Sequence, residues 1–132
     1  QIANNAVTTM DYATTAGAVS VSVTSAWTTL QTLTVTKSRS VPVILHAAAE
    51  FEDMANGSFV LEIQILRGAS LIHQVNIPQA EVGQPPNVVI PVVDRSTASG
   101  DQVYTMRART NGWGGVATDA SNRTIVCLNA LK

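Results

Sequence analysis

The sequence feature that most constrains the fold is a pair of alternating segments between Gly57 and Ile77. The first segment places an apolar residue at every second position: Phe59, Leu61, Ile63 and Ile65. This two-residue period is that of a half-buried β-strand. The alternation resumes at Leu71, after a turn in which Gly68 accepts the positive φ of a hairpin. We therefore predict a β-hairpin, with the rest of the chain arranged around it.

Other segments with the same period surround the hairpin, and polar or glycine-containing turns separate them. They cover residues 18–23, 27–36, 41–51, 88–93, 101–110 and 123–130. Eight evenly spaced strands without an amphipathic helix are typical of an all-β sandwich or barrel. We predict an all-β fold, an eight-stranded antiparallel sandwich that is jelly-roll-like and consists of two four-stranded sheets. A Greek-key sandwich of the immunoglobulin type is the alternative.

The segment Val41–Phe51 differs from the others because both of its alternating faces are apolar. Such a strand is buried on two sides, either inside a sandwich or at a subunit contact. A helix over Ala47–Met54 is the competing interpretation, because Ala, Glu and Met favour helices. We predict a strand through Glu50.

The composition predicts a surface that partners cover. Charged residues make up 13% of the 132-residue chain, roughly half the usual share of about 25%, while 45% of the residues are hydrophobic. A lone soluble domain keeps its surface charged, so a homo-oligomer is the simplest explanation. The net charge of -1 provides no field to attract nucleic acid. No apolar run reaches the roughly 20 residues of a membrane span.

The chain has the length of one domain. We expect residues 1–16 to form a linker or extended segment, with a short helical turn near Thr9–Tyr12, and residues 17–132 to form the sandwich. No signal peptide is present and the chain begins at Gln1, so we expect a fragment or a processed form. Cys127 is the only cysteine, which excludes a disulfide framework and predicts a small core residue.

The best candidate for a ligand contact is Trp113, which lies in the glycine-rich segment Asn111–Gly115 that we predict to be a loop. An aromatic face stacks on the apolar face of a sugar ring, and glycines let a ligand approach the backbone closely. Asn111, Asp119 and Asn122 are near in sequence and are candidates for binding sugar hydroxyls. The alternative is that Trp113 folds back and covers the end of the sandwich.

Two other aromatic residues are expected to be structural: Trp27 as a core or subunit contact, and Tyr104 in the core with its hydroxyl at an edge. Arg107 and Arg109 share one face of a strand, and such a pair can hold carboxylates, phosphates or acidic sugars. A structural network of ion pairs is the favoured interpretation. The acidic partners available for it are Glu62, Asp101 and Asp119.

We predict no metal site, no cofactor and no catalytic centre. His46 and His73 could meet across neighbouring strands, but a metal site needs three or four ligands in tight geometry. The acidic cluster Glu50–Asp53 lacks the spacing of an EF-hand, so a solvated turn is favoured there. The sequence has no G-x-S-x-G motif and no recognisable Ser/His/Asp arrangement, so we predict that the chain is not an enzyme.

The N-terminal run Ile2–Thr9, with the pattern I-x-x-x-A-V-T-T, resembles repeats that precede the tip domains of bacteriophage tail fibres. The stretch Ser25–Leu30 resembles the start of such tip domains, which also end directly after a strand. The resemblance implies a homotrimeric β-sandwich in the tail fibre of a virion, extracellular, that binds a host bacterial surface receptor. It implies no particular receptor residues, because the family has no universal binding motif.

We therefore expect a receptor-binding tip domain whose partners are further copies of itself and a host surface receptor such as a carbohydrate. Three weak sites on one trimer would bind tightly by multivalency. Neither nucleic-acid binding nor membrane insertion is expected. The alternatives are a purely structural trimerising module of a virion fibre and, with weaker support, an enzyme domain that acts on surface polysaccharide.

Overall fold

The computed structural model describes residues 7–21, 26–37, 41–52, 58–78, 87–96, 98–113 and 118–131. Over these ranges the chain forms nine β-strands and no helix. The strands are β1 (Val7–Thr15), β2 (Val19–Val21), β3 (Thr28–Lys37), β4 (Val43–Phe51), β5 (Ser58–Arg67), β6 (Ser70–Pro78), β7 (Asn87–Asp94), β8 (Gly100–Trp113) and β9 (Thr118–Leu131). No helix in this part of the chain could cross a membrane.

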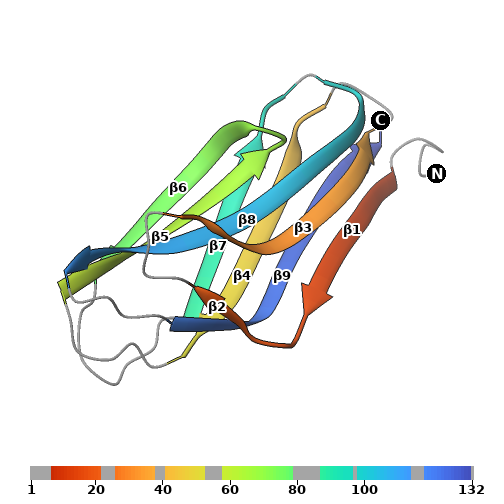
Figure 1. The fold of residues 1–132 in the computed structure, drawn as a ribbon. Coiled ribbons are helices and arrows are strands. Elements are labelled where there is room, and N and C mark those ends of the chain that lie inside the picture. The colour runs from red at the N-terminus through yellow and green to blue at the C-terminus, as the bar shows by residue number, and fades with distance from the viewer. Residues whose placement is uncertain are drawn as a thin grey trace.

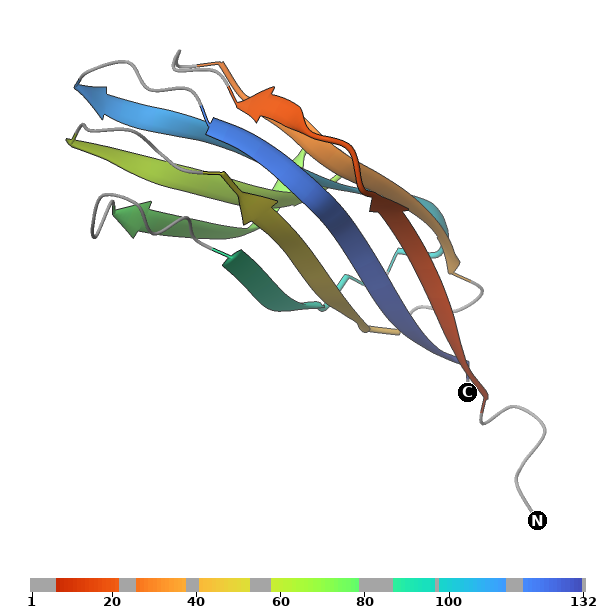
Figure 2. The same ribbon diagram turned by 90° about the horizontal axis from the view of Figure 1, so that it is seen from below.

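The strands form two antiparallel sheets that pack face to face (Figures 1 and 2). The five-stranded sheet has the order β1-β9-β4-β7, and β2 pairs with β9 beyond the end of β1. The four-stranded sheet has the order β3-β8-β5-β6. The predicted all-β antiparallel sandwich is confirmed, and the eight predicted strands correspond to β2–β9. The prediction of two four-stranded sheets is wrong for one of them, which has five strands because β1 joins it.

Strand β1 was not among the strands predicted from the sequence. It pairs with β9 along its whole length, from Val7 opposite Leu131 to Thr15 opposite Arg123. These residues therefore belong to the sheet, and the helical turn expected near Thr9–Tyr12 is wrong. The four threonines of β1 gave no strong apolar signal, although β-branched Thr fits a strand well.

The central hairpin is confirmed. β5 pairs with β6 from Val60 opposite Pro78 to Arg67 opposite Ser70. Gly68 in the turn has a φ of 55°, a left-handed conformation that a residue without Cβ adopts without strain. Its backbone nitrogen also donates a hydrogen bond of 2.8 Å to the carbonyl of Val103, which ties the turn to the neighbouring strand β8.

The core lies between the sheets and consists of the inward side chains of both. In β4, for example, Val43, Leu45, Ala47, Ala49 and Phe51 are buried, and the residues between them point outward. Each fully buried aliphatic or aromatic side chain contributes about 1.5–3 kcal/mol. The predicted core positions of Tyr104 and Cys127 are confirmed, and burial raises the pKa of the Cys127 thiol to about 11.

The predicted strand through Glu50 is confirmed: β4 continues to Phe51, so the competing helix is not formed over Ala47–Phe51. Two other local predictions are wrong. Lys37, expected in a polar turn, is the last residue of β3 and is buried. Residues 111–113, expected in a loop, are the end of β8 and pair with β5. The strand β8 extends so far because β5 offers it a paired backbone as far as Ser58, which outweighs the local preference of asparagine and glycine for turns.

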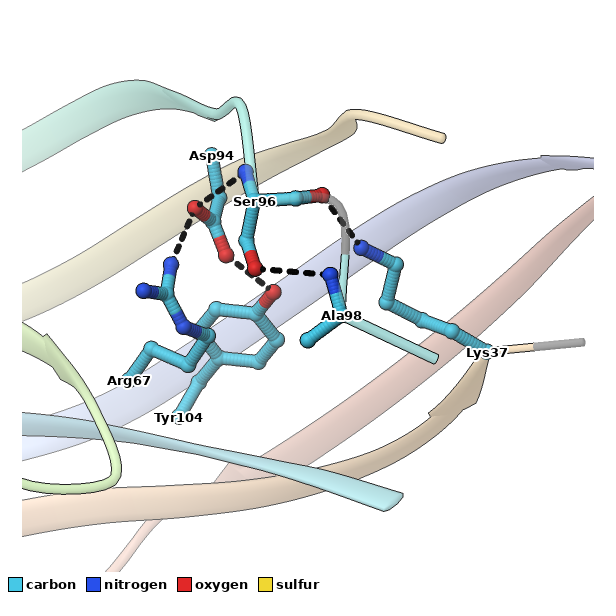
Figure 3. A network of polar contacts seen from close by, with 6 residues as sticks. All are labelled: Lys37, Arg67, Asp94, Ser96, Ala98 and Tyr104. Atoms are coloured by element: carbon cyan, nitrogen blue, oxygen red, sulfur yellow. Dashed lines mark hydrogen bonds and ion pairs between the residues drawn. The ribbon is translucent and has the colours of Figure 1, made fainter. Parts of the chain in front are cut away.

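A polar network at one end of the sandwich joins the two sheets (Figure 3). Its centre is Asp94, a buried carboxylate at the end of β7. Asp94 accepts hydrogen bonds of 2.6 Å from the Tyr104 hydroxyl, 2.5 Å from Arg67 Nη1 and 3.1 Å from the Ser96 backbone nitrogen. The buried Lys37 donates a hydrogen bond of 3.0 Å from Nζ to the Ser96 carbonyl. Three strands of the four-stranded sheet are thereby attached to β7 of the other sheet.

Charge and hydrogen bonding balance the burial of this carboxylate. Burial raises the pKa of Asp94, but the hydrogen bonds from Tyr104, Arg67 and Ser96 outweigh it and hold the pKa below its usual value of 3.8. Burial and the bond to Asp94 raise the pKa of the Tyr104 hydroxyl above its usual range. The network is therefore fully formed at neutral pH, with Asp94 ionised and Tyr104 protonated.

A second polar contact ties the sheets along the β1 and β3 edges. Arg123 of β9 donates hydrogen bonds of 2.6 Å from Nη1 to the Leu30 carbonyl in β3 and 3.0 Å from Nη2 to the Gly17 carbonyl. Gln31 returns a hydrogen bond of 3.1 Å from Nε2 to the Arg123 carbonyl. The pairing of β3 with β8 shifts register between Thr29 and Gln31, so Leu30 lies at an irregularity of the strand. Arg123 contacts the Leu30 carbonyl at this irregularity.

We expect Asp94→Ala to lower the free energy of unfolding by about 3 kcal/mol, because it leaves a partly buried guanidinium and a buried phenol without their acceptor. Asp101→Ala is the matched control, since Asp101 accepts a hydrogen bond of 2.6 Å from Thr36 at an exposed position and should cost about 0.5 kcal/mol or less. Urea denaturation measures both values.

A second variant, Asp94→Asn, tests the charge of Asp94. A carboxyl whose folded pKa is lowered stabilises the fold above its unfolded pKa and loses this contribution as the pH falls through the folded pKa. The stability difference between the wild type and Asp94→Asn should therefore be largest near neutral pH and should shrink below about pH 4. A difference that is constant between pH 7 and pH 3 would contradict an ionised Asp94.

Candidate functional site

The outward face of the five-stranded sheet has a largely apolar region, bordered by a row that contains the exposed Glu50 of β4. Outward side chains of β1, β9, β4 and β7 align in three rows across the sheet. The rows are Met10–Leu128–Ile44–Val93, Tyr12–Val126–His46–Pro91 and Thr14–Thr124–Ala48–Val89. None of these twelve residues is Asp, Glu, Lys or Arg. We call this surface the apolar face.

Large side chains of the apolar face are well exposed in the single chain. Met10 is 60% exposed, Tyr12 64% and Val89 67%. Ile44 of β4 is also exposed, although β4 is an interior strand of its sheet. The sequence prediction that β4 is buried on both sides is therefore not met within one chain, and its outward side is open to solvent or to a partner.

The outward face of the four-stranded sheet is polar. A chain of hydrogen bonds crosses it from β8 to β6: Arg107 Nη2 to Gln64 Oε1 at 2.7 Å, Gln64 Nε2 to Gln74 Oε1 at 2.6 Å, and Gln74 Nε2 to Asn76 Oδ1 at 2.9 Å. In the next row, Arg109 forms an ion pair with Glu62. The predicted structural role of the two arginines is confirmed for Arg109 and Glu62, while Arg107 pairs with an amide instead.

Trp27 lies over both arginines on this polar face. Its ring centroid is 4.8 Å from Cζ of Arg107 and 4.3 Å from Cζ of Arg109. Guanidinium groups at this distance are attracted by the negative face of the ring. Trp27 is half-buried and does not belong to the core, so its predicted core position is wrong, and the predicted subunit contact stays a prediction.

The four residues predicted to bind a ligand come from two strands. Asn111 and Trp113 are at the end of β8, opposite Val60 and Ser58 of β5. Asp119 and Asn122 are near the start of β9, in the other sheet. Asp119 lies opposite Ser20 of β2 and is half-buried. Ligand binding by this group stays a prediction.

Asn122 has a structural function of its own. It has a φ of 45°, and asparagine is one of the few residues with a side chain that adopt this left-handed conformation readily. It lies where the pairing of β9 with β4 shifts register, between Ala48 and Glu50. Its Nδ2 donates a hydrogen bond of 2.6 Å to Glu50 Oε2. Asparagine at this position therefore fits a bulge in the strand.

The described residues contain no group of three or more His, Cys, Asp or Glu that could hold a metal ion. His46 is in β4 and His73 is in β6, which belong to different sheets, so the two do not meet across neighbouring strands. Of the acidic cluster Glu50–Asp53, the last residue lies outside the described residues, and Glu50 accepts the hydrogen bond from Asn122.

Comparison with known proteins finds likeness at the level of the fold. No protein-family model matches the chain, and no curated protein matches it. Among solved structures, the VP2 subviral particle of infectious bursal disease virus has a TM-score of 0.61 at 11% identity, over 93% of this chain and 32% of that chain. The Gx strain of the same virus gives 0.65 at 11% identity, over 94% of this chain and 33% of that chain.

A third structure, the T13 viral particle of infectious bursal disease virus, gives a TM-score of 0.59 at 14% identity, over 94% of this chain and 31% of that chain. The chain thus spans about a third of the length of these proteins. Sequence identity this low shows a shared fold alone: a two-sheet antiparallel β-sandwich that is also found in proteins of virus particles.

The stacking of Trp27 can be tested with a double-mutant cycle. Trp27→Ala and Arg107→Ala should each destabilise the protein, and the coupling energy between them should be about 0.5–1 kcal/mol, because the ring attracts the guanidinium at a half-exposed site. Chemical denaturation of the four proteins gives the coupling. A coupling near zero would mean that the ring only covers the arginines without attracting them.

Proposed function

We propose that this chain is a structural β-sandwich module of a virus particle. The observation that carries the proposal is the likeness to proteins of infectious bursal disease virus particles, which extends over 94% of the chain in the Gx strain structure. The low share of charged residues and the exposed apolar face agree with a domain that is built into an assembly.

In the finer form of the proposal, the module is the receptor-binding tip of a bacteriophage tail fibre. It works as a homotrimer outside the host cell and attaches the virion to a bacterial surface glycan. Support comes from the N-terminal run Ile2–Thr9, which resembles the repeats of such fibres. The proposed glycan contacts are Trp113, Asn111, Asp119 and Asn122, and in this proposal the chain binds without catalysing a reaction.

A purely structural module of the fibre is the second candidate. One observation favours it: on each sheet, polar side chains bond to side chains of neighbouring strands in the same sheet. Asn122 donates to Glu50, and Arg107, Gln64 and Gln74 form one continuous chain of hydrogen bonds. A module of this kind would hold copies of the fibre together and would bind no external receptor.

Binding to an array of purified bacterial surface polysaccharides separates the two candidates. A receptor-binding tip should bind at least one polysaccharide, and Trp113→Ala should weaken that binding at least tenfold, about 1.4 kcal/mol, because stacking on the sugar is lost. Leu71→Ala is the control, since it removes an exposed apolar side chain from β6.

A folded wild-type domain that binds no polysaccharide and no intact bacterial cell would contradict the receptor-binding function and would favour the structural module. Binding that Trp113→Ala leaves unchanged would keep the function and would overturn the proposed contact residue.

A further inference from the structure

The apolar face is about as large as the biggest apolar patch on a typical monomer, and such a patch is often functional. Four strands about 4.8 Å apart and three rows of outward residues about 6.6 Å apart cover roughly 400 Å² in plan. The projecting side chains make its accessible area larger than this. Soluble monomers rarely expose a contiguous apolar patch above a few hundred Å² unless the patch binds something.

Exposed hydrophobic residues are concentrated on this face. Among the described residues, the large hydrophobic side chains that are exposed are Met10, Tyr12, Ile44, Leu71, Val89, Val93 and Val103. Five of them belong to the apolar face, and Leu71 and Val103 are on the four-stranded sheet. The opposite side of the sandwich is occupied by arginines, amides and Glu62, whose polar groups are paired with one another on that face. The asymmetry indicates that one sheet faces solvent and the other faces a partner.

The partner must itself present a flat, uncharged and apolar surface, because a charged surface would lose its hydration without gaining an opposite charge. The described part of this chain presents one such surface, and it is the apolar face itself. We propose that the apolar face packs against the same face of a second copy of this chain, as the self-complementary contact of a two-fold pair does. The proposal rests on the proposed virion function only in that an assembly places copies of the chain beside one another.

The size of the face predicts the strength of the contact. Two apolar faces together would bury on the order of 1,000 Å², near the lower limit for a specific interface between proteins. We therefore expect an association that depends on concentration in solution, and one that a single charge in the middle of the face can disrupt. In a fibre, covalent continuity with neighbouring segments would raise the effective concentration and strengthen the contact.

The test compares two lysine variants at matched positions. Ile44 is 44% exposed on an interior strand of the apolar face, and Val103 is 43% exposed on an interior strand of the polar face. Light scattering across a concentration series should show a wild-type mass that rises above one chain. Ile44→Lys should remain at the mass of one chain, and Val103→Lys should behave like the wild type.

A second measurement shows that Ile44→Lys fails to associate for the proposed reason. Ile44→Glu alone should also have the mass of one chain, but an equimolar mixture of Ile44→Lys and Ile44→Glu should regain association, because opposite charges then meet across the contact. Circular dichroism of each variant confirms that the β-sandwich is folded. A mixture that stays at the mass of one chain would overturn the contact between identical faces.

The outcome for the proposed contact surface can be distinguished from the outcome for the proposed function. An oligomeric wild type whose mass Ile44→Lys does not change would overturn this surface and leave the virion function standing. A wild type with the mass of one chain at all concentrations would also overturn it, whatever the domain binds. An association that Ile44→Lys abolishes, in a domain that binds no bacterial polysaccharide, would support the surface and contradict the receptor-binding function.

Discussion

The alternation of side chains along each strand is the constraint on which the rest of this structure depends. Successive residues of a β-strand point to opposite faces of the sheet. Each sheet of a sandwich therefore directs one half of its side chains into the core and the other half outward. In most sandwiches the outward half is polar. Here the four-stranded sheet follows that rule with Arg107 and Gln64, and the five-stranded sheet departs from it with Ile44 and Val89. Solvent explains the first sheet, and the proposed contact with a second copy would explain the second.

Buried polar groups fix how the two sheets sit on each other. Apolar packing alone tolerates small shifts between sheets, because dispersion contacts have little directional preference. Asp94 requires donors from Arg67 and Tyr104 at fixed distances, and Arg123 requires the Leu30 carbonyl on another edge. Leaving any of these groups unpaired would be costly in the buried interior. These contacts therefore select one arrangement of the two sheets.

Much of the fold could be predicted from the sequence, because the alternation of Leu61, Ile63 and Ile65 has a single structural meaning. Strand β1 escaped prediction, since threonine and alanine give it no apolar period, and its pairing with β9 is a contact between distant parts of the chain. Lys37 was misplaced for a similar reason: its acceptor, the Ser96 carbonyl, is far away in sequence. Local patterns do not contain such long-range partners.

The candidate site was less predictable than the fold. The two apolar faces of Val41–Phe51 were visible in the sequence and suggested a covered surface, while Val88–Val93 was predicted only as a strand. Their assembly with β1 into one face requires the strand order β1-β9-β4-β7, which no local pattern contains. The position of Trp27 over Arg107 and Arg109 likewise depends on the pairing of β3 with β8.

Hydroxyl-radical footprinting of the assembled protein tests most directly whether the apolar face is covered by other copies. Met10 is exposed on this face in the single chain, and Met106 is buried in the core and serves as an internal reference. We predict that Met10 is oxidised slowly at concentrations where the chain associates and quickly in Ile44→Lys, while Met106 stays protected in both. Equal oxidation of Met10 in the two proteins, at a concentration where the wild type is oligomeric, would contradict the account.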